Sequence, residues 1–183
     1  MSRIGKKPIS LPAGVRVSLE PKMVAVAGPL GQLTKPVPVG IGVQVEDGTV
    51  LVTRDSDSNA AKALHGLARS IIANMVRGVT EGFKETVLLE GVGYRAQVQG
   101  NKVQLSVGYS KPVILQTPAG VRVEAETTGR LVVSGIDKET VGQFVANLKA
   151  VRPMSRYGYK DGRGKGIRLA RETVRFKQRK VGV

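Results

Sequence analysis

The sequence contains no cysteine and only one histidine, His65. Without thiols the chain can form no disulfide, no thiolate metal site and no thiol nucleophile. A single histidine also excludes the usual His-rich and Cys-rich zinc sites. No apolar run approaches the ~18 residues of a membrane span, and no hydrophobic segment follows the basic start at residues 1–8. We therefore expect a protein that is neither secreted nor embedded in a membrane, with no metal and no cofactor.

Acidic residues are also scarce, because 14 Asp and Glu face 29 Lys and Arg and leave a net charge of +15. A balance this basic is typical of proteins that bind nucleic acid or an anionic membrane surface. The charge is uneven: residues 1–10 carry +3, residues 151–183 carry +9, and the 140 residues between them carry only +3. The sequence therefore predicts a folded middle with binding segments at both ends.

The segment 151–183 holds eleven Lys and Arg against two acids, Asp161 and Glu172. Such a segment repels itself and shows little apolar periodicity, so we expect it to become ordered only against a partner of opposite charge. A phosphate backbone is the best candidate, since each neutralised phosphate releases a condensed counterion. The alternative is a solvated tail that only adds solubility. The glycines and tyrosines interleaved with the charges favour binding.

Arginine exceeds lysine by seven to four in this segment, and a guanidinium grips phosphate through two donors and also stacks on bases. Tyr157 and Tyr159 offer flat faces to unpaired bases, as in many RNA complexes. Glycines at 162, 164 and 166 would allow close approach of the backbone to the ligand. The candidate RNA-binding residues are Arg152, Arg156, Tyr157, Tyr159, Lys160, Arg163, Gly164, Lys165, Gly166, Arg168, Arg171, Arg175, Lys177, Arg179 and Lys180, with Arg3, Lys6 and Lys7 as a secondary site.

The order of predicted elements in the first half of the chain is repeated in the second half. Alternating apolar residues and turn signals predict strands followed by one amphipathic helix in each half. Similar segments recur at offsets of 76 to 81 residues, among them Lys35-Pro-Val and Lys111-Pro-Val. The expected strands are 14–20, 23–27, 43–46 and 49–53, then 83–90, 93–99, 102–108, 121–124 and 129–134. The first expected helix is capped by Asp55, Asp57 or Ser58 and ends at Gly78 or Gly82, and the second runs from Asp137 to about Val151.

This repeat predicts an α+β fold of two duplicated domains, each an antiparallel sheet with one helix packed on it. The expected boundaries are a basic N-terminal arm at 1–8, repeats at 9–81 and 83–151, and a basic RNA-binding extension at 152–183. The extension follows the second helix directly. We therefore expect the second repeat to carry most of the binding.

Three catalytic or nucleotide-binding patterns fail on their context. Residues 91–96 match a loose dinucleotide fingerprint, but an alternating, strand-like segment follows in place of the required helix. Lys165 between two glycines lacks the Ser or Thr of a phosphate-binding nucleotide loop. His65, with Asp57 and Ser58 nearby in sequence, does not form a hydrolytic trio, because neighbouring helix positions do not converge on one reacting atom.

Four separate motifs give the chain its family resemblance. They are Ser2-Arg-Ile-Gly-Lys-Lys-Pro-Ile9, Gly91-Val-Gly-Tyr-Arg-Ala96, Gly108-Tyr-Ser-Lys-Pro112 and Gly164-Lys-Gly-Ile-Arg168. Together, and in this order, they make the whole chain resemble the bacterial large-subunit ribosomal protein six family. The resemblance implies a duplicated two-domain α+β fold. It also implies binding to large-subunit ribosomal RNA near the elongation-factor binding region and the base of the stalk.

We therefore predict a cytoplasmic, structural RNA-binding protein of the large ribosomal subunit that is not an enzyme and forms no homo-oligomer. Its expected partners are large-subunit ribosomal RNA and neighbouring ribosomal proteins. A sequence-tolerant RNA-binding protein or RNA chaperone outside the ribosome is the first alternative, and it would bind unrelated RNA equally well. A nucleic-acid-processing enzyme is the second, but it would need clustered carboxylates for metal ions, which the sequence does not show.

Overall fold

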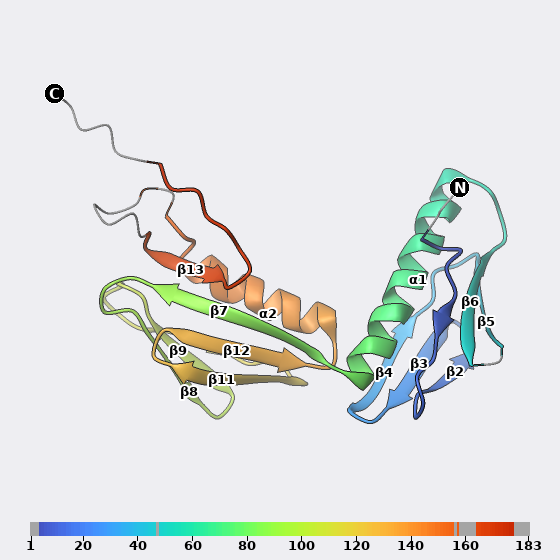
Figure 1. Ribbon diagram of the computed structural model, residues 1–183, viewed down its shortest axis with the longest axis horizontal. Helices are drawn as coiled ribbons and strands as arrows, with labels where there is room; N and C mark the ends of the chain where they lie inside the picture. Colours follow the sequence, from blue (N-terminus) through green and yellow to red (C-terminus); the bar gives the residue numbers. More distant parts are fainter. Residues whose placement is uncertain (1–3, 47, 156, 158–163, 178–183) are drawn as a thin grey trace. The chain divides into compact units, whose positions relative to one another are not determined.

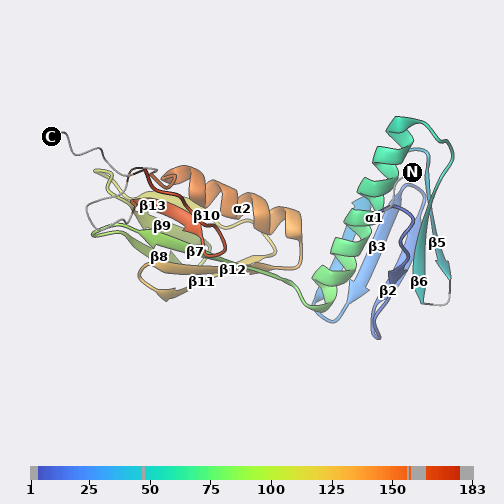
Figure 2. The same ribbon diagram turned by 45° about the horizontal axis from the view of Figure 1, so that its top comes forward.

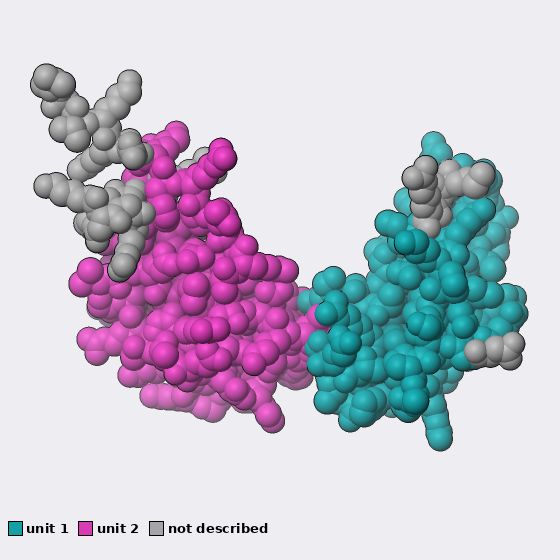
Figure 3. All heavy atoms as spheres, viewed as in Figure 1, with its two compact units in different colours: residues 1–82, 136–138 teal, residues 83–135, 139–183 magenta. Residues whose placement is uncertain are grey.

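A computed structural model of the chain describes residues 4–46, 48–155, 157 and 164–177. The chain divides into two units, unit 1 with residues 1–82 and 136–138, and unit 2 with residues 83–135 and 139–183 (Figure 3). Except for residues 136–138, the repeats expected at 9–81 and 83–151 fall within unit 1 and unit 2 respectively.

Unit 1 contains six strands and the longer of the two helices found in the described part of the chain (Figure 1). Its strands form two antiparallel three-stranded sheets, ordered β1-β6-β5 and β2-β3-β4. Helix α1 covers them and closes the core. The elements are β1 (Ile9–Ser10), β2 (Arg16–Glu20), β3 (Met23–Gly28), β4 (Gly31–Pro36), β5 (Ile41–Glu46), β6 (Thr49–Arg54) and α1 (Asn59–Thr80).

Helix α1 forms where the sequence supplies a cap, an apolar stripe and a stop. The Ser58 hydroxyl accepts a hydrogen bond from the Ala61 amide at 3.2 Å and so satisfies one free N–H of the first turn. Ala68, Ile72, Met75 and Val79 recur at helical spacing and are buried against the sheets. Gly82, at φ +73°, follows the helix and turns the chain toward unit 2.

His65 has a structural role in unit 1. Its ring is buried, its Nε2 lies 2.8 Å from the Val52 carbonyl oxygen, and its Nδ1 lies 3.1 Å from an Arg54 nitrogen. Asp57 binds Arg54 at 2.5 Å instead of the histidine, and this hydrogen bond, aided by Lys62, lowers the pKa of Asp57. His, Asp and Ser therefore form no hydrolytic trio.

The N-terminal segment packs against unit 1 along α1. Gly5 is buried against the His65 ring, where any side chain would collide with the imidazole. The Arg69 guanidinium donates to the Lys7 carbonyl oxygen at 3.2 Å, and β1 then pairs with β6. The described residues 4–8 are thus part of the folded unit, while the Lys6 and Lys7 side chains remain exposed.

Unit 2 contains a three-stranded sheet, β10-β9-β8, and a four-stranded sheet, β11-β12-β7-β13, both antiparallel (Figure 2). Phe144 and Leu148 of α2 pack into one apolar core with residues of both sheets. The elements are β7 (Phe83–Glu90), β8 (Arg95–Gln99), β9 (Lys102–Ser106), β10 (Val113–Gln116), β11 (Val121–Thr127), β12 (Arg130–Gly135), α2 (Lys138–Val151) and β13 (Gly166–Leu169).

The two units repeat one plan, with one addition. The β1-β6-β5 order of unit 1 corresponds to β7-β12-β11 in unit 2, and β2-β3-β4 corresponds to β8-β9-β10. The predicted α+β class, with duplicated antiparallel sheet and helix units, is confirmed, although each unit has two sheets and not one. Strand β13, which pairs with β7 on the edge opposite β12, has no counterpart among the described residues of unit 1.

The sheet register corrects one detail of the predicted repeat. Pro36 pairs with Met23 at the end of the first meander, and Gln116 pairs with Lys102 at the end of the second. Lys35 therefore does not correspond to Lys111, which lies in the loop before β10. The shared Lys-Pro-Val letters do not mark equivalent positions.

Residues 91–96 lead directly into strand β8, which begins at Arg95, and not into a helix, as the sequence predicts. Gly91 and Gly93 have φ values of +152° and +77° and turn the chain from β7 into β8. The structure therefore provides no helix N-terminus for a pyrophosphate at this motif.

In the described part of the chain, neither helix is long and apolar enough to cross a membrane.

Candidate nucleic-acid interface

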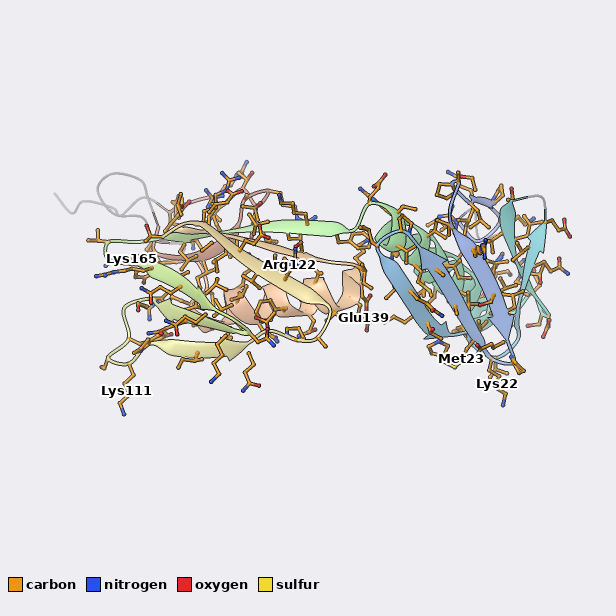
Figure 4. All side chains as sticks on the ribbon, turned by 90° about the horizontal axis from the view of Figure 1, so that it is seen from below. Lys22, Met23, Lys111, Arg122, Glu139 and Lys165 are labelled. Carbon is orange, nitrogen blue, oxygen red and sulfur yellow. The ribbon has the colours of Figure 1, made fainter. Side chains whose placement is uncertain are left out.

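The structure describes several basic candidates of the C-terminal segment, and all of them lie in unit 2. Some lie at the end of the unit where several loops between its strands meet. Antiparallel pairing brings the end of β7 and the starts of β8 and β10 to one end of the unit, because Arg95 pairs with Ser106 and Leu105 with Val113. The C-terminus of α2 reaches the same end, where the Tyr109 hydroxyl donates to the Val151 carbonyl oxygen at 2.9 Å. Lys111 and Lys165 both lie at this end, hereafter the basic end (Figure 4).

The C-terminal segment is anchored to unit 2 by β13. Ile167 is fully buried in the core, and its amide donates to the Arg152 carbonyl oxygen at 2.8 Å. The Ser155 amide donates to the Lys165 carbonyl oxygen at 2.8 Å, which ties the chain leaving α2 to the chain entering β13. The expectation that the whole segment orders only against a polyanion is wrong for these residues. A four-residue strand needs no core of its own when it can add to an existing sheet.

Gly164 and Gly166 are required by packing inside the protein. A side chain on Gly164 would collide with the Phe176 ring, and one on Gly166 would lie 2.7 Å from the Met154 nitrogen and the Pro153 oxygen. Both glycines are buried. The chain's own backbone and side chains therefore occupy the space beside both glycines, and their predicted role in close approach to a ligand stays a prediction.

Arg168 is held by carboxylate and carbonyl groups of its own unit. Its guanidinium donates to a Glu90 carboxylate oxygen through Nε at 2.7 Å and through a terminal nitrogen at 2.6 Å, and it also reaches the Glu172 carbonyl oxygen at 3.1 Å. This paired geometry satisfies the guanidinium within the fold. Arg168 therefore has a structural role in unit 2, and its predicted contact with RNA stays a prediction.

Arg171 is also paired, although it is far more exposed. It binds Glu85 at 3.0 Å, with 72% of its side chain accessible. Exposed pairs of this kind contribute little to stability and can exchange one partner for another. Arg171 remains a candidate for phosphate contact, as do the exposed Arg175 and Lys177.

The basic end contains a cavity of about 480 Å³ that is lined by cationic, aromatic and hydroxyl side chains. Its lining residues are Tyr109, Arg152, Pro153, Ser155, Tyr157 and Lys165. The Arg152 guanidinium lies over the Tyr109 ring, 5.1 Å from its centroid, in a cation–π contact. The hydrogen bond to the Tyr109 side chain favours the protonated guanidinium and raises the pKa of Arg152 further above its ordinary value.

Tyr157 forms the exposed aromatic wall of this cavity, with 65% of the residue accessible. Its amide donates to the Ser155 hydroxyl at 3.2 Å, and that hydroxyl lies 3.3 Å from the Tyr157 carbonyl oxygen. These contacts fix the backbone at Tyr157. The cavity therefore combines a positioned tyrosine with two cations that the sequence places thirteen residues apart, Arg152 and Lys165.

The structure does not place every predicted site residue. Arg152, Tyr157 and Lys165 come together at the cavity, whereas Lys6 and Lys7 lie in unit 1. The predicted residues outside the described ones are Arg3, Arg156, Tyr159, Lys160, Arg163, Arg179 and Lys180.

Sequence reasoning missed Tyr109 and Lys111, which the fold brings to the basic end from the loop between β9 and β10. Tyr109 is 48% exposed and lies beside Arg152 across 43 positions of sequence. The nearest signal was the Gly108-Tyr-Ser-Lys-Pro112 motif, an exposed aromatic and a cation within one turn. Charge counting along the chain could not show which distant segment it meets.

Glu172 joins the C-terminal segment to α2, which gives a testable pH dependence. Its carboxylate accepts from Lys149 at 2.6 Å and from the Leu169 amide at 3.4 Å, and the Lys149 bond is the main reason that the pKa of Glu172 lies below its usual value of 4.5. A lowered pKa means that the folded state favours the ionised form. The resulting stability is complete above about 4.5 and is lost as the pH falls through the lowered pKa.

We expect Glu172→Gln to destabilise unit 2 at neutral pH and to make little difference well below the ordinary glutamate pKa. The chain has no tryptophan, and its four tyrosines all lie between residues 94 and 159, so tyrosine fluorescence during urea unfolding reports on unit 2. Equal destabilisation at both pH values would show that the carboxylate charge is not what matters. Glu124→Gln, at an exposed position of β11, provides the control.

Among the described residues, no three His, Asp and Glu side chains gather closely enough to hold a metal ion. The carboxylates of Glu90 and Glu172 are each bound by a cation of unit 2, Arg168 and Lys149 respectively. What the basic end can do chemically is attract anions and stack flat groups.

Comparison with known proteins agrees with this account. The model of a family described as "Ribosomal protein L6" matches residues 11–82 and 90–161, once in each repeat. The chain belongs to the ribosomal protein L6 family. Members of this family are structural proteins without enzymatic activity, which confirms the prediction that the chain is not an enzyme.

Similar proteins of known name align with the full length of this chain. It is 48% identical to large ribosomal subunit protein uL6 of Caldicellulosiruptor saccharolyticus, covering 100% of this chain and 97% of that protein. The protein of the same name from Rippkaea orientalis is 49% identical, with 100% and 99% covered, and the one from Rubrobacter xylanophilus is 48% identical, with both covered completely. The family resemblance seen in the sequence motifs is therefore confirmed.

Proposed function

We propose that this L6-family chain is a structural constituent of the large ribosomal subunit in the cytoplasm, where it binds and stabilises folded large-subunit ribosomal RNA. The relatives' name supports the subunit. The single observation that supports RNA as the direct partner is the basic end of unit 2, where two cations and two exposed tyrosines surround one cavity. Phosphate contacts give RNA affinity, and aromatic faces give preference for unpaired bases.

The proposed contacts are the exposed and cavity-lining basic residues of unit 2. Arg152, Lys165 and Lys177 contact the RNA, and Lys111 adds a fourth cation. Lys6 and Lys7 of unit 1, with Arg3, form a second and smaller basic site. Arg171 and Arg175 are further candidates for phosphate contact. The other residues proposed from the sequence, Arg156, Tyr159, Lys160, Arg163, Arg179 and Lys180, are part of the same proposal. The finer location, near the elongation-factor binding region and the base of the stalk, is part of the same proposal, as is contact with neighbouring ribosomal proteins.

The experiment that tests this function is sedimentation of a tagged chain from a bacterial lysate. We expect it to travel with large subunits after a high-salt wash, and to protect large-subunit RNA near the factor-binding region from chemical probes. Equilibrium binding to fragments of that RNA should be tighter than to unrelated RNA or duplex DNA of equal length. Equal affinity for all of them would contradict the proposal, and would indicate a sequence-tolerant RNA-binding protein.

A further inference from the structure

The cavity at the basic end has the size and the lining of a site for one nucleotide. Its volume of about 480 Å³ falls within the range of about 300–1,000 Å³ found for small-ligand sites. Neutral apolar side chains dominate most such sites, but here the wall consists of two tyrosines, two cations, a serine and a proline. A lining of this kind suits a ligand with one flat face and one negative charge.

The aromatic and planar groups are positioned before any ligand binds. Tyr109 is fixed by its hydrogen bond to the Val151 carbonyl oxygen, and the Arg152 guanidinium lies over its ring. Tyr157 is fixed at its backbone by Ser155 and leaves most of its ring exposed. A rigid flat surface stacks on a base at low entropic cost, since little side-chain freedom remains to be lost.

The positive charge of Lys165 comes from a second chain segment that lines the same cavity. Lys165 precedes β13, and its carbonyl oxygen accepts from the Ser155 amide, so its backbone is tied to the segment that carries Tyr157. An ammonium group next to an aromatic face matches a nucleotide, in which a phosphate lies one sugar away from the base. A bare phosphate would not use the tyrosines, and a paired base would not expose a face to them.

We propose that this cavity takes a single unpaired nucleotide of RNA. The base stacks on Tyr157 and on the Arg152 guanidinium, and the phosphate binds Lys165. The inference rests on the proposed function and specifies it: the chain captures a nucleotide extruded from the folded RNA, in addition to neutralising the backbone. Free nucleotides share this chemistry. The assignment to RNA rests on the surrounding cations Lys111 and Lys177, which can hold the phosphates that only a continuing chain provides.

The test compares two RNA hairpins, one with a single bulged nucleotide and one that is fully paired. The bulged nucleotide is the fluorescent base 2-aminopurine, and the full-length chain is the binding partner. We expect the chain to bind the bulged hairpin more tightly than the fully paired one and to change the 2-aminopurine fluorescence. Tyr157→Ala should weaken binding of the bulged hairpin by about tenfold or more, the loss expected for one stacked base, while Tyr157→Phe should bind like the natural chain.

Controls separate the cavity from general charge. Arg152→Ala should abolish most of the preference for the bulge. Arg122 is an exposed cation on β11 that lies away from Lys165, so Arg122→Ala should leave the preference unchanged (Figure 4). Adenosine monophosphate alone should bind far more weakly than the bulged hairpin. Equal binding of the two would assign the cavity to a soluble nucleotide and overturn the assignment to RNA.

The result that would overturn the proposal is an unchanged affinity of Tyr157→Ala for the bulged hairpin, or no preference for the bulge in the natural chain. Because Tyr157 is exposed, the alanine variant should keep its fold, which circular dichroism can verify. Sedimentation with the large subunit is measured in parallel. A chain that sediments with the subunit but shows no preference for the bulge would refute this inference and leave the proposed function intact.

Discussion

Replacing Gly166 with alanine is expected to destabilise unit 2 by about 3 kcal/mol or more, from backbone strain and overpacking together. Gly166 has φ +148°, a conformation that residues with a side chain rarely adopt. A new Cβ would also lie 2.7 Å from both the Met154 nitrogen and the Pro153 oxygen. These are backbone atoms in a segment bonded to β13, so they cannot move aside without breaking the pairing.

Urea unfolding followed by tyrosine fluorescence checks this prediction, because all four tyrosines belong to unit 2. Gly142→Ala is the matched control, since Gly142 lies in α2 with no atom within 4 Å of an added Cβ. That variant should be more stable than the natural chain by about 0.5–1 kcal/mol. Opposite signs for one chemical change identify the close packing of β13. Equal stability of the two variants would mean that Gly166 is not confined as described.

Replacing Ile167 with alanine is expected to cost about 2–5 kcal/mol, the range for removing a large aliphatic side chain from a core. Ile167 is fully buried among residues that include Leu89 of β7 and Leu148 of α2. Truncation leaves a cavity that the surrounding sheet and helix fill only in part. A loss of this size is a large fraction of the stability of a small domain.

The same fluorescence-detected unfolding measures this effect in the absence of RNA. Ile114→Ala, at a position on β10 that is 57% exposed, is the control and should change stability by less than about 0.5 kcal/mol. If Ile167→Ala unfolded like the natural chain, β13 would not be part of the free protein. The C-terminal segment would then fold only on its partner, as its charge alone suggests.

Much of the fold could be predicted from local signals in the sequence. The Ser58 cap, the apolar stripe of α1 and the alternation in β5 and β6 act within a few residues, so they can be read one window at a time. Strands β1, β4 and β10 were not among the expected strands. Strand β13 was not predicted, because the described residues of unit 1 contain no counterpart of it and because its stability comes from pairing with β7, about 80 positions earlier.

The candidate site was predictable in composition but not in arrangement. Arg152, Tyr157 and Lys165 were expected as binding residues, and the fold brings them to one cavity. Arg168 was expected there too, but Glu90 holds it within the protein, an ion pair between positions 78 residues apart. A count of charges cannot tell a cation that faces solvent from one that has a carboxylate partner in the fold.

The revised electrostatic picture has two parts. Arg168, Lys149 and Glu172 use their charges to fasten the C-terminal segment to the body of unit 2. Arg152 and Lys165 line a cavity, and Lys111, Arg175 and Lys177 lie exposed on the same unit. The first group provides the rigid support that the second group needs, because preorganised contacts cost less entropy when RNA binds.

The central claim is that folded RNA meets this chain at the basic end of unit 2. An electron cryomicroscopy map of large subunits that contain this chain tests that claim most directly. We predict an RNA phosphate within hydrogen-bond distance of Lys165, and one unpaired base stacked on Tyr157 and the Arg152 guanidinium. A map in which the basic end faces solvent, or is covered only by protein, would contradict the account.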